Sequence, residues 1–358
     1  MDVGVNFFPD VEPDFKTGEQ YFGECLEIVG SLEQLGFSHV RIVEHYFRGY
    51  GGYSPNPLLF LTAAAMVSLN LRLITGAVLP AFNHPLKLAG EIGMLDAISK
   101  GRLEVGFARA FLPHEFERFG VDMDSSRERF EEGVDAVVRL LTEESVSVSG
   151  KFHSFPATTS LPRPTQSPRP PMWVAALSSP ESFRRAGERG FGVMVNPIAP
   201  ESLRENILAY RNAWKESGHQ GNGMVMLAFH MYCHEDVEQA LRDARGPIDS
   251  YLDSLVSAAS EWTTGSSSAA YPGYERMIRS MAEDNCESLI ARDAALVGDP
   301  RSIIEQIERF YLRCGGFDVA SLQVNFSSLD PRKSRASLEL FARKVIPNIL
   351  SLGAPACR

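Results

Sequence analysis

Short runs of β-branched, aromatic and other apolar residues alternate along the chain with longer segments in which apolar residues recur every three or four positions. The short runs predict strands, and the longer segments predict helices. The predicted strands are 3–8, 39–43, 71–79, 103–107, 172–176, 191–195, 224–232 and 319–326. The predicted helices are 19–35, 57–69, 84–100, 125–142, 180–189, 200–217, 235–246, 299–314 and 331–350. This alternation predicts one (β/α)8 TIM barrel domain over residues 1–358.

Two local patterns refine this prediction: the residues at the start of the helix at 125–142, and the residues that follow the first predicted strand. Ser125 and Glu128 have the spacing of a capping box at the helix start. An open doubly wound sheet is the competing architecture, and it often carries G-x-G-x-x-G after its first strand. Phe7-Phe8-Pro9 stands at that position, which favours the barrel.

Two insertions interrupt the repeat, after strands four and seven. Residues 143–171 contain a predicted hairpin and a proline-rich connector. Residues 260–298 begin with a small, polar stretch, and a long segment between the last two strands of a barrel lies near the active-site face. We therefore expect 260–298 to form a mobile lid.

Charge and cysteine content limit the possible binding partners and the cellular compartment of the protein. The net charge of -10 and the lack of a long basic run oppose binding to nucleic acid or to an anionic membrane. The five cysteines form no C-x-x-C pair, which is typical of reduced thiols in a cytosol. The sequence shows no leader-like segment at its start and no apolar stretch of ~18 residues, so we expect a soluble, cytoplasmic protein.

Polar residues that follow the strands are the candidates for chemistry, because barrel active sites lie at the carboxyl ends of strands. Ser178 and Ser179 precede the helix that contains Ser182, and Arg109 follows the neighbouring strand. Ser179 is explained equally by ordinary helix capping. Read functionally, the hydroxyls, the helix N-terminus and Arg109 form an anion site suited to a phosphate.

Histidines give two further hypotheses. His45 follows the second strand, where it is either a surface residue tied to Glu44 or a proton donor and acceptor at the barrel mouth. His230 and His234 stand four positions apart, but they lie in a predicted strand without an evident carboxylate partner. We therefore expect no metal site there.

Several longer motifs carry a family resemblance. EHYF at 44–47, NPLL at 56–59 and AGERG at 186–190, together with VLPAFNHPLKLAGEIGMLDAISKGRLEVGFARAF and FGVDMDSSRERF within 77–130, resemble the bacterial luciferase family and its α subunit in particular. The likeness is dense over residues 1–200 and thins afterwards.

The resemblance implies a two-component monooxygenase that uses O2 and reduced FMN from a separate flavin reductase, through a flavin C4a-hydroperoxide. It assigns the catalytic position to His45, with Glu44 as its motif neighbour. It places the phosphate at Arg109, Ser178, Ser179 and Ser182, and the flavin ring beside Ala108 and a cis peptide between Gly76 and Ala77.

Two departures limit what the resemblance implies. The family's second histidine is Tyr46 here, and its reactive cysteine is Ala108, so light emission is not expected. Phe8, Tyr46 and Phe111 near the mouth suggest an apolar substrate, such as an aldehyde, a ketone or an intermediate of secondary metabolism, although they could equally wall the flavin ring.

Two other functions and two modes of assembly stay open at this point. The alternatives are a deazaflavin (F420)-dependent oxidoreductase on the same barrel and a non-catalytic flavin-binding protein. The family forms dimers through helices near strands two and three, and residues 62–65 are small enough for close helix contact. A homodimer is the expected assembly, with a related second subunit or simple packing on the barrel as alternatives.

Overall fold

The computed structural model describes residues 1–177, 179–197 and 199–352, in which eight parallel strands close into a barrel. The barrel strands are β1 (Asp2–Phe7), β2 (His39–Ile42), β3 (Arg72–Thr75), β4 (Leu103–Phe107), β7 (Met172–Ala175), β8 (Gly192–Val195), β9 (Val225–Cys233) and β11 (Val319–Gln323). They pair in this order, and β11 returns to pair with β1. The predicted (β/α)8 barrel is confirmed, and the open doubly wound sheet is excluded.

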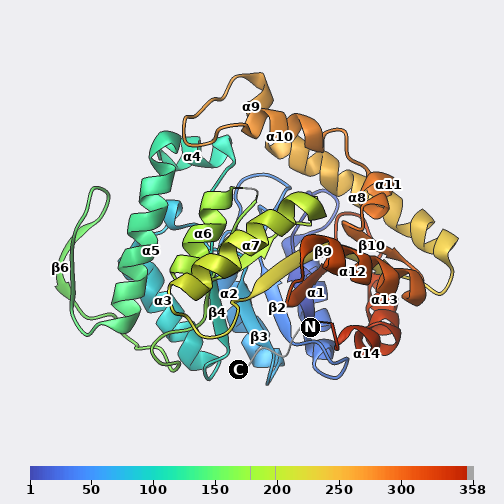
Figure 1. Ribbon diagram of the computed structural model, residues 1–358, viewed down its shortest axis with the longest axis horizontal. Helices are drawn as coiled ribbons and strands as arrows, with labels where there is room; N and C mark the ends of the chain where they lie inside the picture. Colours follow the sequence, from blue (N-terminus) through green and yellow to red (C-terminus); the bar gives the residue numbers. More distant parts are fainter. Residues whose placement is uncertain (178, 198, 353–358) are drawn as a thin grey trace.

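Helices surround the barrel on its outside (Figure 1). They are α1 (Gly18–Leu32), α2 (Pro57–Val67), α3 (Pro85–Ile98), α5 (Ser126–Thr142), α6 (Pro180–Glu188), α7 (Pro200–Glu216), α8 (Val237–Ala258), α12 (Pro300–Cys314), α13 (Pro331–Lys344) and α14 (Ile346–Ile349). The prediction ended α8 at residue 246, whereas the helix continues through Pro247 for a further eleven residues to Ala258. Among the described residues, no helix has the length and apolar character needed to cross a membrane.

The predicted capping box at Ser125 is wrong. Ser125 ends a short 3-10 turn, η2 (Met123–Ser125), and has a helical backbone with φ -84° and ψ -4°. Its hydroxyl donates to the carbonyl of Asp122 at 2.7 Å and makes no capping hydrogen bond to α5. An N-cap residue needs an extended backbone for its side chain to reach the first turn, and Ser125 lacks it.

Both predicted insertions contain regular structure. Residues 143–171 include the antiparallel hairpin β5 (Val146–Ser149) and β6 (Ser154–Thr158), which lies beside α5 outside the barrel (Figure 1). Residues 260–298 form α9 (Glu261–Thr264), α10 (Tyr274–Met281) and α11 (Cys286–Ala291), followed by β10 (Ala295–Gly298). The sequence did not predict β10, which pairs with the last residues of β9. The remaining elements are η1 (Pro80–Phe82) and α4 (Pro113–Phe119).

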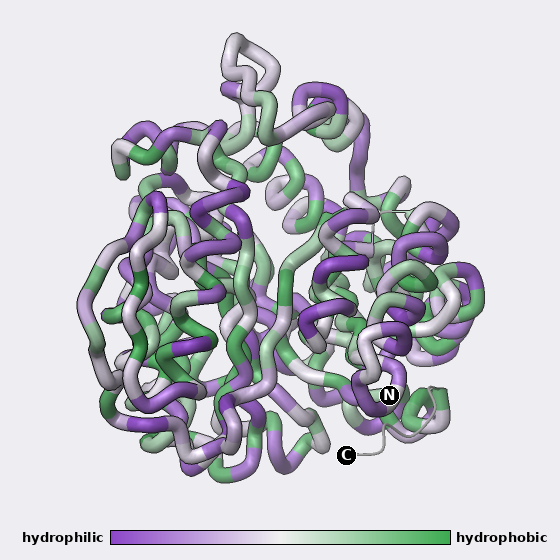
Figure 2. The backbone as a smooth tube through the Cα atoms, turned by 60° about the vertical axis from the view of Figure 1, so that its left-hand side comes forward, coloured by the Kyte–Doolittle hydropathy of each residue, from purple (hydrophilic) through white to green (hydrophobic). Residues whose placement is uncertain are grey.

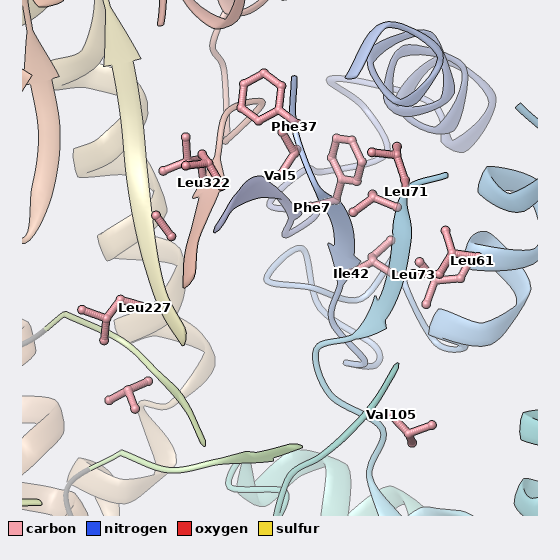
Figure 3. Packing of buried hydrophobic residues seen from close by; sticks show 14 of the residues in the cluster. Val5, Phe7, Phe37, Ile42, Leu61, Leu71, Leu73, Val105, Leu227 and Leu322 are labelled. Carbon is pink, nitrogen blue, oxygen red and sulfur yellow. The ribbon is translucent and has the colours of Figure 1, made fainter. Parts of the chain in front are cut away.

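Successive residues of each strand face opposite sides of the barrel wall. Val5, Phe7 and Ile42 pack outward in the main core, near Leu61 of α2 (Figure 3). Hydrophilic and hydrophobic residues alternate along the outer helices (Figure 2), as expected for helices with one face on the barrel. The inward residues form a smaller apolar cluster of Ile74, Trp173, Met194, Met226 and Val319. Above it the barrel interior opens into a cavity.

Candidate active site

A cavity of about 350 Å³ lies where the barrel strands end, and we call it the barrel cavity. This size is within the range of cofactor and ligand sites. Ten of the residues singled out in the sequence line it, namely Phe8, Glu44, His45, Gly76, Ala77, Ala108, Arg109, Phe111, Ser179 and Ser182. The barrel fold therefore brings together the candidate phosphate residues and the candidate catalytic histidine in one space. Ser178 lies outside the described residues.

Two arginines and two serines line the barrel cavity together: Arg109, Arg127, Ser179 and Ser182. All of them except Ser179 also line a small adjoining hollow of about 50 Å³. Among the described residues neither arginine forms an ion pair with a carboxylate, whereas the nearby Arg185 and Arg189 both pair with Glu131. Two positive charges at the mouth thus remain available to an anion.

Ser179 is the N-cap residue of α6, as predicted, with Pro180 in the first turn. Its hydroxyl, however, makes no capping hydrogen bond to its own helix. The backbone N–H groups at a helix start carry partial positive charge and favour anions. Capping alone therefore does not account for Ser179, and the arrangement suits a phosphate.

His45 has a different carboxylate partner from the one considered in the sequence. Its Nδ1 lies 3.1 Å from Oε1 of Glu115, a fully buried residue of α4. The partner of Nδ1 is therefore Glu115 and not Glu44. The same Glu115 oxygen accepts a hydrogen bond from the backbone N–H of Tyr46. The ring of His45 contacts those of Phe8, Tyr50 and Phe111, with centroids 5.6, 5.5 and 6.0 Å away. His45 is therefore oriented by Glu115, and its Nε2 makes no hydrogen bond within the described residues.

Glu44 holds the loop that follows β3. Its carboxylate accepts hydrogen bonds from the hydroxyl of Tyr46 at 2.5 Å, the side-chain amide of Asn83 at 2.9 Å and the backbone N–H of Leu79 at 3.1 Å. Burial raises the pKa of Glu44 to about 7, although the three hydrogen bonds oppose this rise. Glu44 acts on the position of the 77–83 loop, and its carboxylate makes no hydrogen bond to His45 within the described part of the chain.

The Gly76–Ala77 peptide bond is cis, as the resemblance implied. The carbonyl oxygen of Gly76 accepts a hydrogen bond from Nη2 of Arg41 at 2.9 Å. A Cβ atom at position 76 would lie 2.0 Å from Nε of Arg41, so only glycine fits against this guanidinium. Burial lowers the pKa of Arg41 to about 10, which leaves it charged at neutral pH.

Tyr46 does not line the barrel cavity. Its ring packs against Phe82 and Phe119, with centroids 6.0 and 4.8 Å away, while its hydroxyl donates to Glu44. Tyr46 belongs to the support of the loop after β3 and does not contribute a wall to a substrate pocket. Phe8 and Phe111 line the cavity beside His45.

The segment 260–298 contacts the cavity mouth at several points. The carbonyl of Ala270 accepts a hydrogen bond from Arg109 at 2.9 Å, and the Tyr271 ring lies 4.0 Å below the Arg109 guanidinium. Nε1 of Trp262 donates to the carbonyl of Phe111 at 2.8 Å. Figure 1 shows α9 and α10 over one end of the barrel, on the side of α4. Arg109 thus both lines the barrel cavity and contacts this segment.

Sequence reasoning missed several polar residues of the site, among them Arg41, Glu115 and Arg127. Arg127 lies in the FGVDMDSSRERF motif, which was a usable signal, but Glu115 lies on a short helix that was not predicted. His230 is in β9, as predicted, and faces the cavity, whereas His234 bonds to Asp236 outside it. No group of three His, Cys, Asp or Glu residues within the described part of the chain could hold a metal ion.

Comparison with known proteins decides the family. A family model described as luciferase-like monooxygenase matches residues 1–316. The chain therefore belongs to the luciferase-like monooxygenase family. The resemblance read from the sequence, and with it the class of enzyme, is confirmed.

Individual members of the family match over nearly their whole length. The oxygenase component of a flavin-dependent trigonelline monooxygenase from Acinetobacter baylyi is 29% identical, covering 93% of this chain and 91% of the relative. The structure of the monooxygenase RslO1 from Streptomyces bottropensis is 40% identical with a TM-score of 0.87, covering 97% of this chain and 99% of that one. The oxygenating constituent of a 3,6-diketocamphane monooxygenase from Pseudomonas putida, in complex with FMN, shares the fold at 23% identity, with a TM-score of 0.82 and coverage of 99% and 100%.

Proposed function

We propose that this chain is the oxygenase component of a two-component monooxygenase that uses reduced FMN and O2 to oxidise an apolar organic substrate. The observation that carries the proposal is the continuity of one cavity from the anion site at Arg109 and Ser182 to the ring of His45. A site for a phosphate and a site for proton transfer in one space suit a flavin mononucleotide. The flavin-dependent relative and the FMN-bound structure of the same fold support this choice.

The residues at the mouth match the terminal phosphate of FMN in charge. Arg109 and Arg127 have no carboxylate partner among the described residues, and Ser179 has a hydroxyl that its own helix does not use. Arginine and a helix N-terminus are the usual partners of a phosphate group. Gly76 and Ala77 line the same cavity further in, where the resemblance places the flavin ring.

Bound reduced flavin supplies the electrons that activate O2, and the chain supplies proton transfer and shelter from water. Glu115 accepts the hydrogen of His45 Nδ1, so Nε2 is the nitrogen that takes or gives a proton. The segment 260–298 acts as a lid that closes the mouth through its contacts with Arg109 and Phe111. The oxidant formed from flavin and O2 stays a prediction, as do the substrate class and the separate reductase.

The anion site is tested by comparing FMN with riboflavin, which lacks the phosphate. Arg109→Ala should weaken binding of reduced FMN by about 10- to 100-fold, which is the usual contribution of hydrogen bonds to a charged group. The affinity for reduced riboflavin should stay nearly unchanged. The matched control is Arg184→Ala, because Arg184 lies on α6 but pairs with Glu181 and Glu188 away from the cavity. Anaerobic fluorescence titration gives the affinities. Equal losses for both flavins would contradict the proposed phosphate site.

Two alternative functions are separated from this one by rapid mixing. Protein loaded anaerobically with reduced FMN should reoxidise the flavin more slowly on contact with O2 than free FMN does, because the cavity shelters it. Reoxidation at the rate of free flavin would favour a deazaflavin-dependent enzyme. Tight retention of oxidised flavin through gel filtration, with no oxygen chemistry, would favour a flavin-storage protein.

We also propose that the chain works as a homodimer through α2 and α3. Leu59 and Met66 of α2 are each exposed by 73%, Leu69 just after α2 by 80%, and Met94 of α3 by 57%. Such a group of apolar side chains is a usual mark of a protein interface. Of the small residues 62–65 that the sequence suggested for this contact, Ala64 and Ala65 are buried within the chain, whereas Thr62 and Ala63 are partly exposed.

The organisation of residues 1–358 as one domain and a cytoplasmic location remain predictions.

A further inference from the structure

Four polar side chains form a single layer across one half of the barrel. His230 of β9 is in register with Gln323 of β11, Gln323 with Asn6 of β1, and Asn6 with Arg41 of β2. Each of the four lines the barrel cavity. Their strand neighbours, such as Phe7 and Leu322, pack outward, so the alternation of the strands directs this layer inward. We call these four residues the polar layer.

The polar layer has hydrogen-bonding capacity that the described residues do not satisfy. Arg41 has Nε and Nη1 without a partner, Gln323 has Nε2, Asn6 has Oδ1 and His230 has Nε2. Buried polar groups nearly always find a partner, since leaving one without costs roughly 1–3 kcal/mol. Unused groups concentrated on one cavity wall therefore indicate a ligand or water at this wall.

The layer carries a net positive charge. Arg41 is buried and forms no ion pair with a carboxylate among the described residues, and its only acceptor is the carbonyl of Gly76. Burial lowers the pKa of His230 to about 4, so this ring is neutral at pH 7 and adds no second charge. A buried cation without a partner is unfavourable and is retained where an anion neutralises it. The unused donors, two on Arg41 and one on Gln323, point to an oxygen anion.

The position of the layer distinguishes it from the phosphate site. The closed barrel order places β9, β11, β1 and β2 together, opposite β4 and β7. Arg109 follows β4 and Ser179 follows β7, so the two cationic sites lie on opposite halves of the barrel. The wall of the same cavity also includes the apolar side chains of Phe8, Leu252 and Met277. Arg41 reaches the Gly76 carbonyl from this half of the barrel, so the polar layer lies next to the place proposed for the flavin ring and can receive a second molecule beside it.

We propose that the substrate carries an anionic oxygen, as a carboxylate or an ionised phenol or enol, which binds to Arg41 and Gln323 in the polar layer, with its apolar body toward His45. This proposal rests on the proposed function, because it assigns the substrate of the same cavity. Asn6 and His230 accept hydrogen bonds from hydroxyl groups beside the anion. An acidic aromatic or polycyclic compound satisfies all of these groups, whereas a simple alkane or terpene leaves Arg41 without a partner.

Calorimetric titration of the purified full chain with matched probes tests the proposal. The first pair is 2-naphthoate and its neutral isostere 2-naphthamide, which represent a carboxylate. The second pair is 4-nitrophenol at pH 8, where it is ionised, and 4-nitroanisole. The wild-type protein should bind one anion at least about 10-fold more tightly than its neutral partner, as expected for one charge-assisted hydrogen bond. The pair that shows the preference identifies the acid.

Arg41→Met keeps the length of the side chain and removes the charge, so it should abolish the preference. Arg41→Lys should keep part of it. The control is Arg72→Met, because Arg72 also belongs to a barrel strand but pairs with Glu104 and does not line the cavity. If Arg41→Met fails to fold, Gln323→Leu should reduce the preference with Arg41 intact. No preference in the wild-type protein for either anion, or a preference that persists in Arg41→Met, would overturn the proposal.

Binding of reduced FMN separates this proposal from two other outcomes. Arg41→Met should lose less affinity for reduced FMN than for the anion, because its only expected effect on the flavin is indirect, through the lost hydrogen bond to the Gly76 carbonyl. A fall in FMN affinity as large as the lost anion preference would mean that Arg41 faces the flavin, and would overturn the proposal. If the anion preference holds but Arg109→Ala leaves FMN binding unchanged, the anion site stands and the proposed flavin function fails.

Discussion

Replacement of Glu44 by glutamine should change how the stability of the protein depends on pH. Glu44 is buried, and burial raises the pKa of its carboxyl group from 4.5 to about 7. Glutamine has nearly the same shape but no proton to lose. It also loses one acceptor, so Glu44→Gln should be less stable than the wild type at low pH, where both side chains are neutral.

The sign and size of the pH effect follow from the two pKa values. Between pH 4.5 and 7 the unfolded chain has released the Glu44 proton while the folded chain still binds it. Stability falls with pH wherever the folded state binds more protons. A difference of about 2.5 pKa units corresponds to about 3 kcal/mol at 1.36 kcal/mol per unit. The wild type should lose this amount between pH 4.5 and 7, and Glu44→Gln should not.

Urea unfolding at a series of pH values between 4.5 and 8 measures the effect. The free-energy difference between wild type and Glu44→Gln should shift by about 3 kcal/mol in favour of the variant across this range. Glu117→Gln is the control, because Glu117 is an exposed carboxyl on the nearby helix α4. A difference that stays constant with pH would refute the raised pKa. A difference that moves in favour of the wild type would mean that the three hydrogen bonds outweigh burial.

Three further predictions concern catalysis, the lid and assembly. His45→Ala should leave the affinity for reduced FMN unchanged and slow organic product formation by ~10²–10⁴-fold, the usual worth of a general acid or base, and unchanged turnover would remove His45 from the mechanism. Trp262→Ala removes the hydrogen bond to Phe111, so amide hydrogen exchange should accelerate within 260–298; equal exchange in both proteins would argue against a lid held at this point. Met66→Glu places a charge on the exposed face of α2 and should convert a dimer into monomers in sedimentation, whereas a wild-type monomer would contradict the proposed assembly.

The barrel was predictable from sequence because its signals are local. Each strand is a short apolar run, each is followed by a helical pattern, and all eight predicted strands are present. The errors lie where tertiary contacts override local signals. The helix α8 continues through Pro247, and β10 forms because it pairs with β9, a partner more than sixty residues away in the chain. A four-residue strand has too little pattern of its own to be recognised.

The same distinction applies to the site. Residues directly after strands, such as His45 and Arg109, were found because the barrel topology brings strand ends together. Glu115 was missed because it reaches His45 from a short helix seventy residues later, and no spacing rule connects them. Arg41 was missed because a charged residue inside a strand usually indicates an outward, solvated position. Its inward direction is set by the register with Asn6, which only the closed barrel reveals.

The two halves of the barrel mouth suggest how one cavity serves two anionic molecules. Arg109 is shared between the proposed phosphate site and the carbonyl of Ala270, so occupation of that site would act directly on the proposed lid. Arg41, by contrast, contacts the Gly76 carbonyl, and its position is linked to the loop that Glu44 holds through Leu79. On the proposed function, flavin binding would therefore affect the lid, whereas substrate binding would affect the peptide against which the flavin ring is expected to lie. An acidic substrate that neutralises Arg41 would act at that peptide without displacing the phosphate, which gives the enzyme a physical means to sense its substrate beside the bound cofactor.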